Sequence, residues 1–264
     1  MKFKNVLLAS DFDGTLKTDD GIITDDVKKA ISGFMVQGGF FTVCTGRIYQ
    51  GFHLYNKEYI NAPVLLGNGA MAYDYEKEKI IFNDAVGEEG LPAIRDILKV
   101  FPDISIEFYN FDKVCAINLN SHSEQHFTSQ GIEFNIITEP EDAKLPWTKV
   151  MIAAHGHSKE VQDILEKHPE VNFLKTTGDY VEILKKGVDK GTGLLKLANA
   201  LGCDARNTYA AGDGYNDVEM LVAAAGSFVP ENGSTEALSV AKHVTRSNND
   251  GCIAHAIEIL NNIY

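Results

Sequence analysis

The sequence predicts an α/β fold, in which a parallel-sheet core domain is interrupted by an inserted α+β domain. Two patterns support this fold class. Short apolar runs alternate with helical patterns at both ends of the 264-residue chain, and this alternation is typical of βαβ units in a parallel sheet. Between these ends, strand-like runs and helices are mixed over roughly a hundred residues, a length at which a segment can form its own domain.

The first part of the core is predicted from three apolar runs. The first strand is the run 6–10, which is followed by turn-forming residues. A helix comes next, because Thr24 can cap its start and Gly38-Gly39 can end it. Two more apolar runs, 40–44 and 64–66, each end in a turn that contains glycine. We therefore expect buried strands whose carboxyl ends carry polar loops.

The middle of the chain differs from its ends, because a predicted hairpin over residues 71–82 leads into mixed strands and helices. The strands expected there are 104–109, 114–119, 150–154, 171–175 and 180–184, and the helices are 91–100, 121–130 and 158–167. The parallel pattern then returns, with helices from Lys190 and over 218–225, 235–241 and 252–260 and strands at 208–211, 228–229 and 243–245. We place the core at residues 1–82 and 185–264 and the inserted domain at 83–184.

Composition excludes some partners. The chain has 24 Lys and Arg against 37 Asp and Glu, a formal net charge of −13, which disfavours nucleic acid or an anionic membrane as the general partner. We see no signal peptide and no run near the ~18 apolar residues of a membrane span, so we expect a cytoplasmic protein, a monomer or a weak homodimer. Isolated cysteines are expected to stay reduced, and these are Cys44, Cys115, Cys203 and Cys252.

The first strand ends in two carboxylates, Asp11 and Asp13, followed by Gly14 and Thr15. In an open parallel sheet, ligands bind just beyond the carboxyl ends of the strands. Two carboxylates this close repel each other unless a cation lies between them, and Mg²⁺ prefers oxygen ligands of this kind. Alone, the stretch fits a polar turn equally well.

Three other polar clusters follow strand ends or open a core helix: Thr45-Gly46-Arg47, Lys190, and the segment from Asp213 to Asp217. Because parallel strands end at one edge of a sheet, these clusters can converge with the first two carboxylates. Carboxylates for a cation, a hydroxyl and backbone N–H groups for phosphate oxygens, and a lysine suit phosphoryl transfer. Taken singly, Thr45 fits a helix cap, Lys190 a surface lysine and the last segment a loop.

With these motifs in order, the chain resembles the haloacid dehalogenase superfamily phosphatases of the Cof-like branch, whose α/β cap is inserted between the second and third motifs. Asp11-Phe12-Asp13-Gly14-Thr15 matches the first motif, Thr45-Gly46-Arg47 the second, Lys190 the third, and Gly212-Asp213 with Asn216-Asp217 the fourth. The resemblance spans essentially the whole chain and implies a Rossmann-like core with a cap domain. One departure is Val229-Pro230, where relatives often have Ala-Met.

The resemblance implies a role for each matching residue. Asp11 would be the nucleophile, and Asp13 would protonate the leaving group and then deprotonate the hydrolytic water. Mg²⁺ would be held by Asp11, the backbone carbonyl of Asp13, and Asp213. Asp217 would be a metal ligand through water or would orient the other ligands. The phosphate and substrate would be bound by Thr45, Gly46, Arg47, Lys190 and Asn216.

The activity implied is Mg²⁺-dependent hydrolysis of small phosphorylated metabolites, most often sugar phosphates, through an aspartyl-phosphate, with pyridoxal phosphate and related esters as alternatives. A phosphomutase would use the same residues, and a receiver-like phosphoacceptor or binding protein would share the sheet and the cation. Asp13 argues against a hydrolytic dehalogenase. Arg47, Asn68, Tyr180 and Glu182 are candidate substrate contacts.

Overall fold

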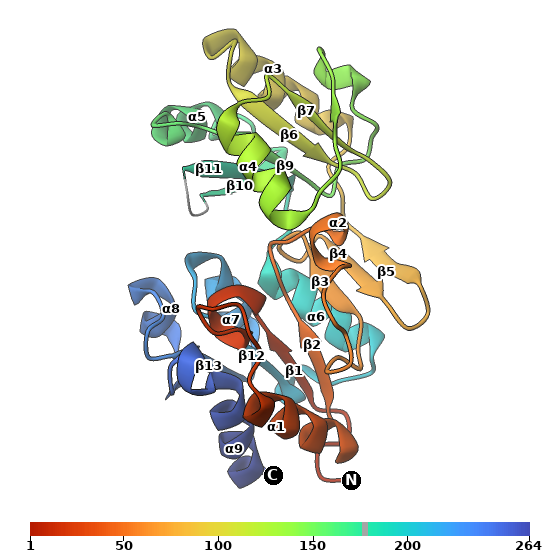
Figure 1. Cartoon of the computed structure of the whole chain (residues 1–264), viewed down its shortest axis with the longest axis vertical. Coiled ribbons are helices and arrows are strands. Elements are labelled where there is room, and N and C mark those ends of the chain that lie inside the picture. Colours follow the sequence, from red (N-terminus) through yellow and green to blue (C-terminus); the bar gives the residue numbers. More distant parts are fainter. Residues whose placement is uncertain (176–178) are drawn as a thin grey trace. The chain divides into compact units, whose positions relative to one another are not determined.

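The computed structural model describes residues 1–175 and 179–264, which form two compact units (Figure 1). The first unit contains residues 1–46, 56–82 and 189–264. The second unit contains residues 47–55 together with the described part of 83–188. Residues 47–55 therefore group with the second unit, although the sequence placed them in the core domain.

The first unit is built on a five-stranded parallel sheet with the strand order β14-β13-β12-β1-β2. Strand β1 pairs along its full length with β12 on one side and with β2 on the other. The predicted parallel core is thus confirmed. Its strands are β1 (Leu7–Ser10), β2 (Phe40–Val43), β12 (Thr208–Ala211), β13 (Gly226–Pro230) and β14 (His243–Thr245).

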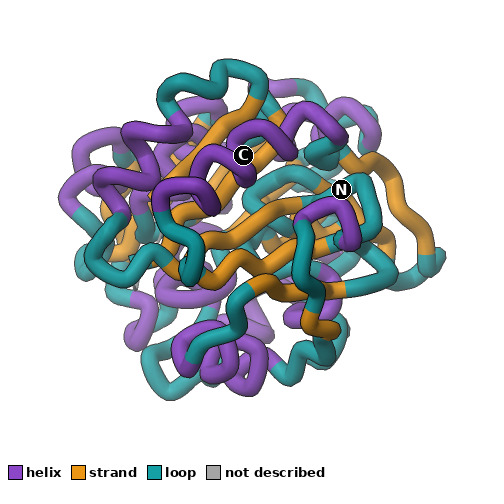
Figure 2. The backbone as a smooth tube through the Cα atoms, turned by 90° about the horizontal axis from the view of Figure 1, so that it is seen from above, coloured by secondary structure: helices purple, strands orange, loops and turns teal. Residues whose placement is uncertain are grey.

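Helices pack against this sheet in two groups. Helices α6, α7 and α8 share one apolar cluster with Leu7 and Ala9 of β1. Helices α1 and α9 pack on each other and on the strands β2, β13 and β14, and the helix that carries the C-terminus can be followed beside the strands in Figure 2. The helices are α1 (Asp25–Val36), α6 (Lys190–Ala200), α7 (Val218–Ala223), α8 (Thr235–Val240) and α9 (Cys252–Ile263).

Two caps fix where core helices begin. The Thr24 hydroxyl accepts a hydrogen bond from the backbone N–H of Val27, which confirms the predicted cap of α1. At α6, the carboxylate of Asp189 accepts from the N–H of Thr192, and the Thr192 hydroxyl accepts from the N–H of Asp189, a capping box. Lys190 is consequently the first residue of α6, so its position is set by this cap.

The third apolar run does not continue the parallel sheet. Strand β3 (Val64–Leu66) meets the end of β2 through one parallel bridge, Cys44 to Leu65, and pairs antiparallel with β4 (Met71–Asp74), beside which lies β5 (Lys79–Asn83). The reason is the turn at residues 67–69, where three successive φ angles of 57°, 54° and 89° turn the chain back on itself.

The second unit contains a six-stranded sheet with the order β10-β11-β9-β6-β7-β8, antiparallel except for the pair β7–β8. The mixed α+β character predicted for the insertion is confirmed. The two-residue strand β8 was not predicted, because both its residues are exposed and leave no apolar pattern. The strands are β6 (Ser105–Tyr109), β7 (Val114–Ile117), β8 (Asn135–Ile136), β9 (Lys149–Ala153), β10 (Val171–Lys175) and β11 (Tyr180–Lys185).

Both faces of this second sheet are covered. One face packs on the helices α3 (Leu91–Val100) and α5 (Ser158–Leu165). The other face packs on α4 (Ser121–Gln130), and Ile48 joins this second cluster next to the short helix α2 (Tyr49–Phe52). Burial of Ile48 on this face explains why residues 47–55 group with the second unit.

Two further findings bear on the chain as a whole. All four cysteines are buried, and none forms a disulfide. Among the residues that the structure describes, none of the helices combines the length and the apolar character needed to cross a membrane.

Removal of the Phe127 ring should destabilise the second unit, because this ring is buried and stacks on Phe134 with 4.3 Å between centroids. We expect Phe127→Ala to lower the free energy of unfolding by about 3–5 kcal/mol. Denaturant titration followed by the fluorescence of Trp147, the single tryptophan, reports this unit directly. The control Ile136→Ala removes an exposed side chain and should change the value by less than about 0.5 kcal/mol. Equal losses in the two variants would contradict the packing.

Candidate functional site

A buried ammonium group lies between two carboxylates beyond the strand ends of the first unit. Lys190 Nζ donates to Asp11 Oδ1 at 2.5 Å and to Asp217 Oδ1 at 2.6 Å. Lys190 is 1% exposed, Asp217 1% and Asp11 7%. Polar groups buried this deeply need hydrogen-bonding partners, so this contact fixes all three side chains relative to one another.

The backbone places these residues without long loops. Asp11 is the residue directly after β1, and Asp213 is the second residue after the end of β12. Because Ser10 and Ala211 are register partners, the chains leave the sheet side by side. The sequence prediction that strand-end residues converge at one edge of the sheet is fulfilled for this pair of segments.

Asp213 is held against the turn that follows Asp11. The Thr15 hydroxyl donates to Asp213 Oδ1 at 2.5 Å. Gly14 has a φ of +86°, and a Cβ at this position would lie 2.6 Å from Asp213 Oδ2. Glycine is therefore required here both by the backbone conformation and by the close approach of a carboxylate.

Both oxygens of Asp217 are engaged. Oδ1 accepts from Lys190, and Oδ2 accepts from the backbone N–H groups of Asp213 at 3.0 Å and Gly214 at 2.8 Å. Since these bonds fix the orientation of the carboxylate and of the loop that carries Asp213, Asp217 organises the site.

Burial and charge perturb the acid–base properties of the cluster. Burial is the largest influence on Asp11 and raises its pKa to about 8, with Lys190 acting in the opposite direction and Asp217 and Asp213 adding to the rise. Burial also raises the pKa of Asp213. For Lys190, burial by itself lowers the pKa, but the carboxylates of Asp11 and Asp217 outweigh it and the net pKa is raised. Lys190 therefore stays charged.

The carboxylates can hold a metal ion. Oxygen atoms of Asp11, Asp213 and Asp217 all lie within 4.8 Å of one another, and three carboxylates outnumber the single ammonium. A donor set made only of oxygen atoms suits a hard divalent cation such as Mg²⁺. These residues fit the cation that the sequence predicts.

A second group of polar residues adjoins the turn at residues 67–69. Asn216 Nδ2 donates to Asn68 Oδ1 at 3.0 Å, and Asn68 is 1% exposed with a φ of 54°. The same Asn68 oxygen lies 3.1 Å from the position that a Cβ on Gly46 would occupy. Thr45 is buried, and its backbone carbonyl accepts from the N–H of Asn68. The turn thus brings Asn216 together with Thr45 and Gly46.

Two further predicted site residues have other partners. Asp13 pairs with Lys17 at 2.7 Å, and the Asp13 side chain is 47% exposed. Arg47 belongs to the second unit, where its guanidinium lies 5.2 Å from the centre of the Tyr55 ring. The candidate contacts Tyr180 and Glu182 belong to the second unit as well.

Sequence reasoning assigned no role to three residues that support the site. Thr15, Lys17 and Asp189 each contact or position a predicted site residue. The capping box of Asp189 and Thr192 has a recognisable four-residue spacing and could have been found. The pairing of Lys17 with Asp13 left no comparable signal, because a single lysine near two aspartates is common.

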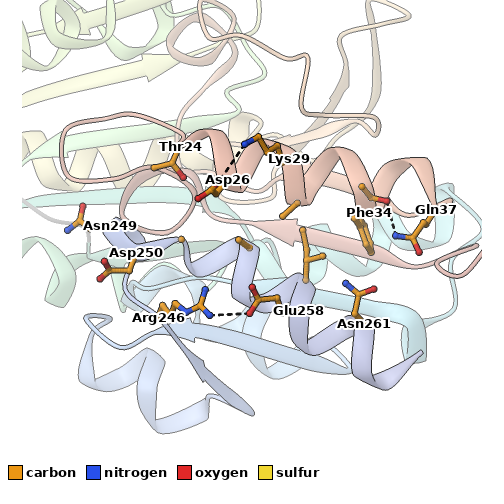
Figure 3. A pocket seen from close by; sticks show the side chains of 15 residues that line it. Thr24, Asp26, Lys29, Phe34, Gln37, Arg246, Asn249, Asp250, Glu258 and Asn261 are labelled. Atoms are coloured by element: carbon orange, nitrogen blue, oxygen red, sulfur yellow. Dashed lines mark hydrogen bonds and ion pairs between the residues drawn. The ribbon is translucent and has the colours of Figure 1, made fainter.

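A separate groove of about 570 Å³ lies between α1 and α9 of the first unit (Figure 3). On the α9 side, Arg246 and Glu258 form an ion pair at 3.3 Å, and on the α1 side Asp26 pairs with Lys29 at 3.6 Å. None of the predicted site residues lines this groove. It is distinct from the carboxylate cluster.

Residues 8–257 match the family of haloacid dehalogenase-like hydrolases. A protein of Streptococcus pyogenes serotype M6 that is named as a phosphatase is 32% identical over 275 residues, covering 95% of this chain and 96% of that protein. The 5-amino-6-(5-phospho-D-ribitylamino)uracil phosphatase YitU of Bacillus subtilis is 26% identical, with 98% of each chain covered.

The fold has close structural neighbours. The structure of the haloacid dehalogenase subclass IIB sugar phosphatase BT4131 superimposes with a TM-score of 0.86 at 19% identity, covering 97% of this chain and 99% of that one. At this identity the likeness concerns the fold. The resemblance and the fold class predicted from the sequence are both confirmed.

Gly14→Ala should weaken cation binding, because the added Cβ would press on Asp213. We expect the affinity for Mg²⁺, measured by isothermal titration calorimetry, to fall about 10- to 100-fold. The matched control is Gly21→Ala, since Gly21 also has a positive φ of +76° but no atom within 4 Å of the new Cβ. If both variants lose affinity alike, backbone strain rather than contact with Asp213 is the cause.

Asp11 should make the metal-free protein less stable as the pH rises. Its pKa is about 8 in the folded chain against an ordinary value of 3.8, so between these values the folded state holds a proton that the unfolded state has lost. The free energy of unfolding then decreases with pH, by at most about 1.4 kcal/mol per pH unit for this proton.

Denaturant titrations in chelator between about pH 5 and pH 8 test this expectation against Asp11→Asn, which lacks the titrating group. The wild type should lose stability more steeply than the variant. If stability changes with pH equally in the wild type and the variant, the pKa of Asp11 in the folded chain is not raised.

Proposed function

Because the chain belongs to the haloacid dehalogenase-like hydrolases, we propose that it is a Mg²⁺-dependent phosphatase of small phosphorylated metabolites, acting through an aspartyl-phosphate on Asp11. The observation that carries the proposal is the buried cluster in which Lys190 lies between Asp11 and Asp217, with Asp213 beside them. Such a cluster serves phosphoryl transfer through positioning and charge.

Asp11 is the nucleophile in this proposal. Its carboxylate oxygen attacks phosphorus, and the bond between phosphorus and the leaving-group oxygen breaks. Lys190 contacts the same carboxylate, so its positive charge lies where negative charge accumulates on the phosphoryl group. Thr45, the N–H of Gly46, and Asn216 bind the phosphoryl oxygens.

Asp13 performs the two proton transfers. It first donates a proton to the leaving oxygen, which departs as an alcohol. It then takes a proton from the water that attacks the aspartyl-phosphate, releasing inorganic phosphate and restoring Asp11. The exposed position of the Asp13 side chain agrees with a role toward a substrate that enters from solvent.

The cation would be held by Asp11, Asp213 and the backbone carbonyl of Asp13, with Asp217 orienting the loop of Asp213. When bound, it neutralises the carboxylates and the phosphoryl charge. The supporting observations are the all-oxygen donor set and the absence of a side chain at Gly14, which leaves Asp213 close to the Asp11 turn.

Sugar phosphates are the substrate class we favour, since a structural neighbour at 19% identity is a sugar phosphatase. A relative is named as a phosphatase of 5-amino-6-(5-phospho-D-ribitylamino)uracil, so a phosphorylated polyol is a second candidate substrate class. Arg47, Asn68, Tyr180 and Glu182 are proposed substrate contacts. A phosphomutase is the second candidate, because it would use the same Asp11 and Asp13.

The test is release of inorganic phosphate from a panel of phosphorylated sugars, polyols and pyridoxal phosphate, with Mg²⁺ and with chelator. We expect metal-dependent release by the wild type and a loss of about 10⁴-fold or more in Asp11→Asn, because the nucleophile is removed. The control Asp163→Asn changes an exposed carboxylate of the second unit and should retain full activity. Transfer of the phosphoryl group between sugars without release would instead establish the mutase.

A further inference from the structure

Lys17 is a cation beside the acid–base residue, and the proposed mechanism does not use it. Its Nζ lies 2.7 Å from Asp13 Oδ1. The Asp13 side chain is 47% exposed, whereas the Lys17 side chain is only 10% exposed. Lysine side chains at the surface normally keep their charged end in water, so a buried lysine that reaches an exposed carboxylate is unusual.

The ammonium group of Lys17 also contacts an aromatic ring. Its Nζ lies 4.4 Å from the centre of the Phe12 ring, and Phe12 is fully buried. A cation over the face of an aromatic ring is attracted to it, more strongly where water is excluded. The ammonium is thus fixed between the ring of Phe12 and the carboxylate of Asp13.

The backbone of Lys17 is anchored independently. Its N–H donates to the carbonyl of Phe12 at 3.1 Å, and its carbonyl accepts from Asn248 Nδ2 at 3.0 Å. Asn248 is 2% exposed and is itself bonded to Asn232 through two hydrogen bonds, of 2.8 Å and 3.2 Å. Two loops of the first unit therefore brace the residue whose ammonium contacts Asp13.

From this arrangement we infer that Lys17 is a positioning residue that holds the Asp13 carboxyl group in the orientation needed for proton transfer. Lys17 contacts Oδ1, so it restrains rotation of the carboxyl group and fixes the direction of the other oxygen. The Asp13 side chain is 47% exposed, so an anchored partner such as Lys17 restricts the rotamers it samples. The inference rests on the proposed function, because it concerns the acid–base step of that reaction.

The reaction offers a readout that is specific for this role. Departure of an alkyl alcohol requires the proton from Asp13, whereas an aryl group such as p-nitrophenol leaves readily without one. The ratio of kcat/KM for an alkyl phosphate to kcat/KM for p-nitrophenyl phosphate therefore reports the positioning of Asp13. This ratio does not depend on the fraction of protein that is folded.

We expect Lys17→Met to lower kcat/KM for the fastest alkyl phosphate by about 10- to 100-fold and to leave p-nitrophenyl phosphate within about threefold. Lys17→Arg should restore part of the loss, since it keeps the cation. In the Asp13→Asn background, Lys17→Met should add no further loss, because the two residues act as a pair. Lys159→Met is the matched control, as Lys159 forms an exposed ion pair with Asp163 four residues away.

Other results would overturn the inference. An equal loss with both leaving groups would show that Lys17 serves only the structure of the loop, and unchanged kinetics would show that Asp13 needs no restraint. An additive loss in the Asp13→Asn background would place Lys17 in another step. If the wild type releases phosphate from no ester, the proposed function fails, and this inference fails with it.

Discussion

The first unit depends on one buried contact, in which the ammonium of Lys190 joins the carboxylates of Asp11 and Asp217. Burial and the neighbouring carboxylates raise the pKa of Asp11, and the ammonium of Lys190 acts in the opposite direction. Removing one partner would leave a buried charge without compensation, which costs about 3–5 kcal/mol in proteins. The strand ends and the start of α6 are thereby tied together, although the residues are far apart in the sequence.

Glycines allow close backbone approach around the cluster. Gly14 admits Asp213, and Gly69 packs so closely on the start of α6 that a Cβ there would lie 2.3 Å from the carbonyl of Asp189. Gly193 in turn lies against Gly69. The turn at residues 67–69 and the capping box of α6 therefore position Lys190 through close backbone contacts.

The division of the chain follows its apolar surface. The sequence prediction placed residues 47–55 in the core domain, but Ile48 is buried against the second sheet. The apolar pattern of each strand shows that a face will be buried. It does not show which of two sheets a short helix will cover. The same reason explains why the pairing of the third apolar run was not predicted. This run forms one parallel bridge with the end of β2 and pairs mainly with β4, in the antiparallel direction.

By itself, the sequence determined the parallel core, the mixed insertion and the four polar clusters, because apolar periodicity and turn residues are local patterns that a linear chain displays. Only the tertiary structure decided which polar residues meet. Lys190 reaches Asp11 across 179 positions, and Asn216 reaches Asn68 across 148. Such pairs depend on strand order and register, which emerge when the sheet assembles, and so does the brace that holds Lys17 through Asn248.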